Sequence, residues 1–536
     1  MDPSEKTKKK LQNALKLSGF NIRREFCSYL VEKFGDSGLN LNCNEIFDET
    51  IKNISSVLEN QCSSGQSIER EHIERVLEVC LHSGYDHNET VFNVINAFDF
   101  PRLSYHLDRK IYQQDHQKSK LLAEPEVNSK MFLDRYSKVL QRTRRIFAHS
   151  LLRGEKNQLT LQTVDFLLTS SEVTLDRTLI LGALLQGPDG GLVLEDPTGF
   201  VKLDLTHAKY HPGFYVETCI ILVNGFYEDK ILHVSTMIMP TGEDYVNSRP
   251  TFGNINYFGG PSNVTLKDSK RLNKHLMDNP DGMFVFLSDV WLDHPQTFQK
   301  LEKLFDQMEQ FAPPVAFVFM GNFMSESHGT EMLDVLKKEF KRLGELIARY
   351  HLLVASSKFV FVPGLNDPST PYIVPRLELP TYITEGVKKT LPNAIFATNP
   401  CRIQYCTKEI VVFRGDILNK LLQESLFKPS KQDTPNCIAK TIVGQGHLCP
   451  LSLNAFNVHW DFDYCMSLYP LPDLAVIGDK ADGYKKQYKN CIVMNPGPFC
   501  TGDFSFKMYY PNYDLNEAVI DCAVDVADND ENAMEN

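Results

Sequence analysis

Three apolar runs, each ending in a polar loop, constrain the fold of this chain more than any other feature. They are MFVFLSDVW from Met283, VAFVFMGNF from Val315 and KFVFVPGLND from Lys358. Apolar residues recur at helical spacing between them, so buried strands with helical crossovers indicate an α/β sheet. In such sheets the working groups lie beyond the carboxyl ends of the strands, where Asp289, Asn322 and Asp367 stand. We assign this domain to residues 281–512.

Short β-like runs separated by turn residues occupy residues 178–240. The strings PDGG and DPTG form strong turns between them, a pattern typical of a small closed barrel of the OB type. We assign the barrel to residues 160–280. OB barrels often bind single strands through a basic groove with stacking aromatic side chains. From Ser171 to Pro240 there are four Lys or Arg against nine Asp or Glu, so we expect a protein-docking or architectural barrel.

The first part of the chain, residues 1–82, carries apolar stripes at helical spacing between Gly, Ser and Asn breaks. A small helical domain is expected there, and its outer face could dock a partner. The stripes consist of Phe26, Leu30 and Phe34, then Phe47, Ile51, Ile54 and Leu58, then Ile73, Val76, Leu77 and Cys80.

Residues 83–159 are assigned to a linker and a connecting helix. The stretch from Asp99 to Lys130 is polar, holds two prolines and shows weak periodicity, so an extended linker is expected. Periodicity returns over residues 131–152, which predicts a helix. Its basic residues could touch nucleic acid, although a solvated helix face is the favoured interpretation; they are Lys138, Arg142, Arg144 and Arg145.

Net charge bears on the class of partner. The value of −12 argues against wrapping nucleic acid by the bulk field of the chain, so a protein partner is expected. Much of the excess is local, because residues 514–536 hold eight acidic residues and no basic one. We therefore assign residues 513–536 to a solvated, partly disordered acidic tail.

Cysteine spacing and hydropathy indicate the cellular compartment in which the chain is expected. Thirteen cysteines without framework spacing are typical of reduced thiols in an intracellular chain. Cys401 and Cys406 have no second pair at matching spacing, so no metal site is predicted. No stretch of about 20 apolar residues and no apolar signal core are present, so neither membrane insertion nor secretion is expected.

The order of the strand-end loops resembles the calcineurin-type metallophosphoesterase family, with its D-x-H, G-D-x-x-D, G-N-H-D, H, G-H-x-H pattern. The resemblance implies carboxylates, imidazoles and an amide that hold two metals, which activate a water and clamp the phosphate. This chain departs from the pattern throughout. In Asp289-Val290-Trp291, indole stands where an imidazole ligand belongs, and indole offers only an N–H donor.

The other motifs are degenerate as well. They read Gly321-Asn322-Phe323-Met324-Ser325, Gly364-Leu365-Asn366-Asp367 and Gly478-Asp479-Lys480-Ala481. Only one carboxylate and one histidine survive, and we expect the first to cap a helix or satisfy loop amides and the second to be a hydrogen-bonded loop histidine. No metal, cofactor or catalytic residue is therefore predicted at the degenerate positions Asp289, Trp291, Asn322, Ser325, Leu365, Asn366, Asp367, His447, Asp479 and Ala481.

The predicted fold class is multidomain: a small all-α amino-terminal domain, an OB-type β-barrel and an inactive α/β calcineurin-like phosphoesterase domain. That combination is similar to the B-subunits of eukaryotic replicative DNA polymerases, and the helical amino end is similar to the epsilon branch. The strings EDPTGFVKLDL, FYVETCIILVNG, FVPGLNDP, QGHLCPLSL, PDLAVIGDK and NPGPF carry this resemblance nearly end to end.

The resemblance implies a non-catalytic scaffold subunit in the nucleus. It would bind the zinc-containing carboxyl-terminal region of the DNA polymerase epsilon catalytic subunit and reach the replicative helicase through its amino-terminal domain. It would contact DNA only indirectly, through the complex.

Two other functions remain open. An active phosphoesterase could recruit ligands from Asp293, His294, Asp367 and His447. A free single-strand-binding protein could use the barrel, although its acidic balance disfavours this.

Overall fold

A computed structural model describes residues 3–17, 20, 22–36, 51, 54–55, 58, 68, 70–81, 89–152, 160–170, 174–326, 331–369 and 372–524. The chain divides into two compact units. The first comprises Met1–Val91, Pro101–His116 and Arg249–Ser269, and the second comprises Phe92–Phe100, Gln117–Ser248 and Lys270–Asn536. Within the described ranges, none of the helices combines the length and the apolar character needed to cross a bilayer.

The amino-terminal part of the first unit is helical, as predicted. Its helices are α1 (Pro3–Leu17), α2 (Arg24–Asp36) and α4 (Arg70–Leu81). Their apolar faces form one core, in which Leu30 of α2 and Val76 of α4 are fully buried. Helix α1 adds Leu11 and Leu15 to this core, which none of the predicted stripes included. Phe47 and the side chains of Phe34 and Cys80 lie outside the described residues.

The expected extended linker is wrong for residues 102–115, which form a hairpin, and for residues 125–130, which begin helix α5 (Pro125–Leu152). Strands β2 (Arg102–His106) and β3 (Ile111–Asp115) pair in antiparallel register, with Tyr105 opposite Tyr112. Tyr112 is buried and its ring stacks on that of Phe252 with centroids 4.4 Å apart. Polar composition concealed the hairpin because its stabilising aromatic contact comes from about 140 residues further along the chain.

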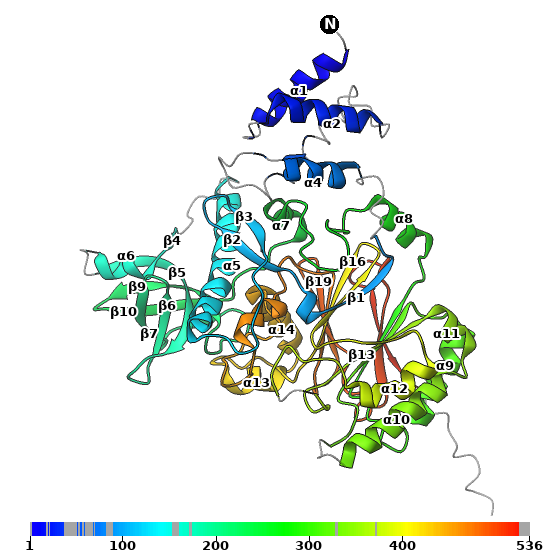
Figure 1. Cartoon of the computed structure of the whole chain (residues 1–536). Coiled ribbons are helices and arrows are strands. Elements are labelled where there is room, and N and C mark those ends of the chain that lie inside the picture. The colour runs from blue at the N-terminus through cyan, green and yellow to red at the C-terminus, as the bar shows by residue number, and fades with distance from the viewer. Residues whose placement is uncertain are drawn as a thin grey trace, which may run out of the picture. The chain divides into compact units, whose positions relative to one another are not determined.

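The second unit contains the predicted barrel (Figure 1). Strands β5 (Thr174–Gln186), β6 (Leu192–Asp196), β7 (Gly199–Asp204), β10 (Ile231–Ile238) and β9 (Ile220–Glu228) pair in that order, and β9 returns to β5 to close the ring. Short strands β4 (Leu161–Gln162) and β8 (Lys209–Tyr210) extend it. Helix α5 (Pro125–Leu152) packs Tyr136 and Val139 against the barrel, and helix α6 (Val164–Thr169) lies beside β7.

The rest of the second unit holds two six-stranded sheets, of which the first contains the three apolar runs. Its order is β14 (Ala394–Phe396), β13 (Lys358–Val362), β12 (Ala316–Met320), β11 (Phe284–Ser288), β20 (Ser505–Tyr509) and β21 (Val519–Ala523). Helices α9 (Thr297–Gln310), α10 (Glu331–Ile347), α11 (His351–Ser356) and α12 (Thr381–Thr390) cover its outer face (Figure 1). Parallel pairing of β11, β12 and β13 confirms the predicted α/β sheet.

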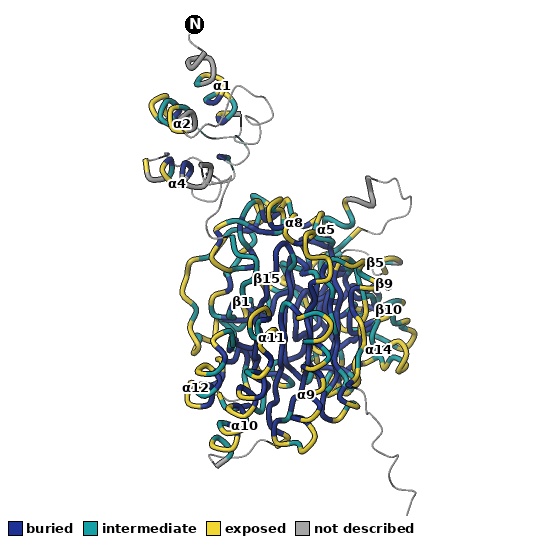
Figure 2. Tube along the Cα trace, turned by 90° about the vertical axis from the view of Figure 1, so that its right-hand side faces the viewer, coloured by how far each residue is buried: buried dark blue, intermediate teal, exposed yellow. Residues whose placement is uncertain are grey.

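The second sheet has the order β1 (Phe92–Asn96), β15 (Cys401–Tyr405), β16 (Lys408–Arg414), β17 (Leu474–Gly478), β19 (Cys491–Asn495) and β18 (Tyr484–Tyr488). It faces the first sheet, since Phe284 of β11 packs edge-on against Tyr405 of β15 at 5.4 Å between ring centroids. Helix α14 (Thr434–Gln445) packs on its other side, and α13 (Leu418–Glu424) follows β16. The central strands β11, β12, β15, β17 and β19 are completely buried (Figure 2).

Shorter elements join these layers. They are the 3-10 helices η1 (Ala97–Asp99) and η2 (Trp460–Met466) and the helices α7 (Tyr245–Phe252) and α8 (Lys270–Asp278).

The predicted acidic tail is wrong for its first part. Strand β21 pairs with β20 in antiparallel register, with Val519 opposite Tyr509, and so forms the edge of the first sheet. Val519 and Val524 are buried there. The acidic residues around it concealed this strand, four of whose five residues, Val519, Ile520, Cys522 and Ala523, are apolar. Residues 525–536 lie outside the described part of the chain.

Candidate functional site

The carboxyl ends of the first sheet bring the strand-end polar residues together. Asp289 follows β11, Asn322 lies just beyond β12, and Asp367 stands in the loop after β13; all are buried. The backbone N–H of Asn322 donates to Asp289 Oδ1 at 3.0 Å. The backbone N–H of Phe323 donates to Asp367 Oδ1 at 2.8 Å. The loops are therefore cross-linked by hydrogen bonds from backbone amides to the carboxylates.

Two glycines permit this close approach. A Cβ atom at Gly321 would overlap the carboxylate of Asp367, and one at Gly364 would overlap the side-chain amide of Asn322. Gly321 and Gly364 therefore allow the neighbouring loops to pack closely against each other.

The guanidinium of Arg414 occupies the centre of this cluster. Arg414 ends β16 and its side chain is fully buried. Its Nη2 donates to both carboxylate oxygens of Asp289, at 2.8 and 2.9 Å. Its Nη1 donates to Asp416 Oδ1 at 2.6 Å and to the carbonyl of Gly478 at 3.1 Å, and its Nε donates to the carbonyl of Gly321 at 2.6 Å. A permanent positive charge thus lies between carboxylates from both sheets.

Charge and burial shift the pKa values of Arg414 and Asp367 in this cluster. Burial alone would lower the pKa of Arg414, but the charges of Asp289 and Asp416 and their hydrogen bonds raise it above its ordinary value. Arginine stays protonated in proteins in any case. Burial raises the pKa of the Asp367 carboxyl to about 6, against hydrogen bonds from the N–H groups of Phe323 and Gly364 that lower it.

The degenerate final motif contributes a capping carboxylate. Asp479 follows β17 and is fully buried, and its Oδ2 accepts hydrogen bonds from the N–H groups of Ile417 (2.7 Å) and Leu418 (2.8 Å) at the start of α13. Its Oδ1 accepts one from the N–H of Ala481 at 3.1 Å. Burial raises the pKa of Asp479. Both oxygens are thus committed to backbone amides, as at a helix amino terminus.

A pair of metal ions does not fit these residues. Asp289 presents both oxygens to a guanidinium, and those of Asp367 and Asp479 accept backbone N–H groups. Among the described residues, no group of three or more His, Cys, Asp or Glu side chains is placed to hold a metal ion. Trp291 Nε1 is buried without a hydrogen-bond partner, and it is a donor that cannot coordinate a cation.

The remaining positions of the degenerate motifs make local contacts. The N–H of Ser325 donates to Asp293 at 2.9 Å, and the N–H of Asn366 donates to Asn322 Oδ1 at 2.9 Å. Leu365 is half-buried in the same loop. His294, which an active enzyme would have recruited with Asp293, has its ring beside that of Phe504 at 5.9 Å between centroids.

His447 takes part in a different cluster. Its Nε2 lies 3.2 Å from Asp463 Oδ1, and its Nδ1 accepts the N–H of Cys449 at 3.1 Å, so Nε2 carries the proton. Asp463 in turn forms an ion pair with Arg135 of α5. Burial, followed by the charge of Arg135, lowers the pKa of His447. This histidine anchors a helix and is not held against Asp289 by any contact in the described chain.

The basic residues of α5 were expected either to touch nucleic acid or to form a solvated face, and both expectations are wrong except at Arg144, which is exposed. Arg142 is 1% exposed and donates to the carbonyls of Val443 and Gly444 at the end of α14. Arg145 Nη2 forms an ion pair with Glu243 at 2.7 Å. Lys138 Nζ donates to Ser467 Oγ at 3.4 Å. These side chains join α5 to α14 and to the segments that follow β10 and η2, so they are neither a nucleic-acid surface nor a solvated face.

Arg414 is the site residue that sequence reasoning missed. The only local signal is an arginine at the end of the apolar run EIVVF, followed directly by Gly415 and Asp416. A charge ending a buried strand must be paired. Its main partner lies 125 residues earlier in the chain, which no local pattern reveals.

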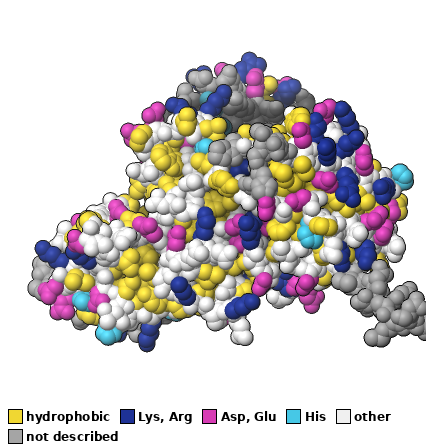
Figure 3. Space-filling model, turned by 90° about the horizontal axis from the view of Figure 1, so that it is seen from below, with side chains coloured by type: hydrophobic (Ala, Val, Ile, Leu, Met, Phe, Trp, Pro, Cys, Tyr) yellow, Lys and Arg dark blue, Asp and Glu magenta, His cyan; other side chains and the backbone are white. Residues whose placement is uncertain are grey.

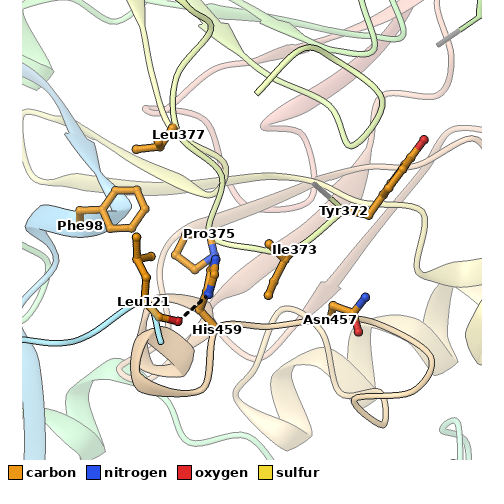
Figure 4. A pocket seen from close by; sticks show the side chains of 8 residues that line it. All are labelled: Phe98, Leu121, Tyr372, Ile373, Pro375, Leu377, Asn457 and His459. Carbon is orange, nitrogen blue, oxygen red and sulfur yellow. Dashed lines mark hydrogen bonds between the residues drawn. The ribbon is translucent and has the colours of Figure 1, made fainter. Parts of the chain in front are cut away.

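A separate hollow of about 540 Å³ opens on the surface of the second unit (Figure 4). Apolar side chains form most of its wall, and His459 Nδ1 lies 3.2 Å from the carbonyl oxygen of Leu121 at its floor. Burial lowers the pKa of His459. Among the described residues that line it, none carries a carboxylate or a thiol for catalysis. They are Phe98, Leu121, Tyr372, Ile373, Pro375, Leu377, Asn457 and His459.

Family models match three parts of the chain. The model for the amino-terminal region of DNA polymerases epsilon matches residues 4–80, and the model for the OB-fold domain of proteins like DNA polymerase epsilon subunit 2 matches residues 125–241. The model for the B-subunits of DNA polymerases alpha and epsilon matches residues 284–486.

Curated relatives are similar over nearly the whole length. The chain is 40% identical to DNA polymerase epsilon subunit 2 of Homo sapiens, covering 95% of this chain and 97% of that protein. It is 37% identical to the protein of the same name from Drosophila melanogaster (94% and 96% covered) and 30% identical to the DNA polymerase epsilon B-subunit of Arabidopsis thaliana (96% and 98%). A solved archaeal phosphodiesterase aligns with 45% of this chain and 98% of its own, at 14% identity and a TM-score of 0.26.

Proposed function

The chain belongs to the DNA polymerase epsilon B-subunit family, and we propose that it serves this polymerase as a scaffold whose former phosphoesterase site has become a structural centre. It is an accessory subunit of DNA polymerase epsilon, not the catalytic subunit, and the catalytic subunit is its partner. Its fold class is the predicted one: helical amino-terminal domain, OB barrel and phosphoesterase-like α/β domain.

One observation carries the structural part of this proposal: Arg414 holds both oxygens of Asp289. A divalent cation would have to displace a buried guanidinium that is hydrogen-bonded by all of its nitrogens. The degenerate positions therefore support loop packing, and we propose no catalytic role for any of them.

The finer points of the assembly are also proposals. The carboxyl-terminal region of the catalytic subunit would bind this chain, and the amino-terminal helical domain would reach the replicative helicase in the nucleus. Two attachment points on one chain raise the effective concentration of the polymerase beside the helicase without a new catalytic group. DNA would be contacted only through the complex, in keeping with the net charge of −12. The domain boundaries 1–82, 83–159, 160–280, 281–512 and 513–536 remain proposals from the sequence, with the correction that β1 (Phe92–Asn96) and β21 (Val519–Ala523) belong to the sheets of the α/β domain.

Co-purification tests the scaffold role. Tagged full-length chain should recover the polymerase catalytic subunit from nuclear extract at one-to-one stoichiometry. Deleting residues 1–82 should leave that recovery unchanged and reduce recovery of helicase subunits. Recovery of no polymerase, or equal loss of both partners on deletion, would contradict the proposal.

A phosphoesterase assay tests the structural role of the old site. The purified chain with added manganese should not hydrolyse a phosphodiester chromogenic substrate above the rate of buffer with manganese. Manganese-dependent turnover by the wild-type chain that disappears in Asp289→Asn would refute the structural interpretation.

A further inference from the structure

Helix α5 has two faces with different tasks. The basic side chains Arg135, Lys138, Arg142 and Arg145 bind the α/β domain. The apolar face packs Tyr136 and Val139 against Leu179, Leu181, Ile220 and Leu222 of the barrel. One turn closer to the amino end, Phe132 and Leu133 continue this face. Phe132 is half-buried, with the Arg135 guanidinium 5.5 Å from its ring centroid, and Leu133 is 48% exposed.

The uncovered end of this face opens into a groove of about 620 Å³ between α5 and the barrel. Its helix side comprises Ser129, Phe132, Leu133 and Tyr136, and its barrel side comprises Ala183, Leu185, Thr218 and residues 195–200. This volume lies within the range of peptide and small-molecule sites. Most of the lining surface is apolar, which favours an apolar guest.

Further exposed apolar side chains lie on strand β7 and on helix α6. Phe200 of β7 is 54% exposed, and Leu168 of α6, 48% exposed, lies beside Gly199. Phe166 of the same helix is 46% exposed. Figure 3 shows hydrophobic side chains gathered on the barrel lobe at its left. Large half-exposed side chains in one place are unusual on a monomer surface and mark interaction sites.

The charged residues that line the groove are the carboxylates Glu195 and Asp196. Glu195 is exposed, lies directly opposite Phe200 across the β6–β7 pair, and forms no ion pair within the described chain. Asp196 is buried, and its oxygens accept N–H groups of Val164 and Thr198. Of the described residues that line the groove, none is Lys or Arg, and nearby Lys202 is already paired with Asp189 at 2.6 Å.

We propose that this groove docks a short peptide segment of a partner protein that carries a large apolar side chain next to a Lys or Arg. The apolar side chain would enter between Leu133 and Phe200, and the cation would lie against Glu195. Charge complementarity selects this occupant over a nucleic acid, whose phosphates would meet a carboxylate and no cation among the described lining residues. The proposal goes beyond the scaffold role and can fail without affecting it.

The test starts from a library of short random peptides displayed on phage and selected on the full-length chain. Selected sequences should combine Leu, Phe or Trp with Lys or Arg. A fluorescein-labelled synthetic copy is then titrated with wild-type chain by fluorescence anisotropy. Phe200→Ser and Leu133→Ser should each weaken binding by about tenfold or more, as for anchor residues at interfaces.

Further variants separate charge from apolar contact. Glu195→Gln should weaken binding by about two- to fivefold and reduce its salt dependence, because the residue is exposed. Phe311→Ser, at an 86% exposed phenylalanine on the end of α9, is the matched control and should leave the affinity unchanged. Each variant is checked by its urea unfolding midpoint, since changes at exposed residues should leave the fold intact.

Several results would overturn the proposal. They are the absence of any selected peptide, a selection dominated by acidic peptides, or equal affinity for wild type, Phe200→Ser and Leu133→Ser. Binding of a labelled single-stranded oligonucleotide that Phe200→Ser abolishes would assign the groove to nucleic acid instead. Self-association of the wild type that Phe200→Ser abolishes would assign it to a second copy of the chain.

Discussion

Replacing Arg414 by Met is the most direct test of the buried guanidinium. Methionine keeps the apolar stem but leaves the carboxylate of Asp289, which is 0% exposed, without its cation. Breaking a buried ion pair from one side typically costs about 3–5 kcal/mol. The carbonyl of Gly321 also loses its donor, and a buried group left unpaired costs about 1–3 kcal/mol. The carbonyl of Gly478 keeps the N–H of Gly415 at 3.0 Å.

The predicted loss is therefore about 4 kcal/mol or more, a large part of the roughly 5–15 kcal/mol that stabilises a typical domain. A second substitution sharpens the reasoning. Asp289→Asn removes the uncompensated charge, so the double variant Asp289→Asn, Arg414→Met should recover about 2 kcal/mol or more relative to Arg414→Met alone. Such recovery is the signature of a coupled pair.

Tryptophan fluorescence gives a local readout, because the chain has only two tryptophans, Trp291 and Trp460. In a Trp460→Phe background the remaining indole stands two residues from Asp289. Urea unfolding should shift its midpoint down by about 1–4 M at ordinary slopes. Arg349→Met is the control: Arg349 and its partner Glu302 are 69% and 50% exposed, so about 0–1 kcal/mol is expected. An Arg414→Met midpoint no lower than that of the control would refute the reasoning.

Three further predictions follow from buried charges. Arg142→Met should lower the unfolding free energy by about 2–3 kcal/mol because the end of α14 loses a buried donor, whereas exposed Arg144→Met should stay within about 0.5 kcal/mol. Burial lowers the pKa of His447, so the unfolded chain takes up a proton that the folded chain resists; stability should fall as pH drops below about 6.5, and His447→Gln should flatten that slope in urea titrations. Because Arg414 supplies the positive charge beside Asp289, dialysis against EDTA should leave the thermal midpoint unchanged, and a drop would reveal a bound metal.

The layers of the fold could be predicted because their signals are local. The strands before Asp289 and Asn322 consist almost entirely of apolar residues. Such a run is expected only for a strand that is covered on both faces of its sheet. Strand β1 could not be predicted in the same way. Its residues are half-buried, and its partner β15 lies about 300 residues further along the chain.

The site could be predicted only in part. Motif comparison identified which ligand types are missing at Trp291, Asn322 and Ala481. It could not identify what replaces them, since the replacing charge enters from the other sheet. The prediction for the basic residues of α5 was wrong for a related reason. A Lys or Arg on a helix is usually solvated, and only tertiary contacts reveal that Arg142 caps another helix.

Buried arginines with fixed partners explain how an enzyme fold can serve as a scaffold. A metal pair binds reversibly, so a site that depends on it varies with ion supply and pH. Arg414 is covalently part of the chain and stays protonated, so its links between the two sheets persist under all conditions in which the domain is folded. Arg135 and Arg142 fix α5, and with it the barrel, to the same domain. A second unit locked in this way presents its outer surfaces in constant geometry, which reduces the ordering cost of each docking event.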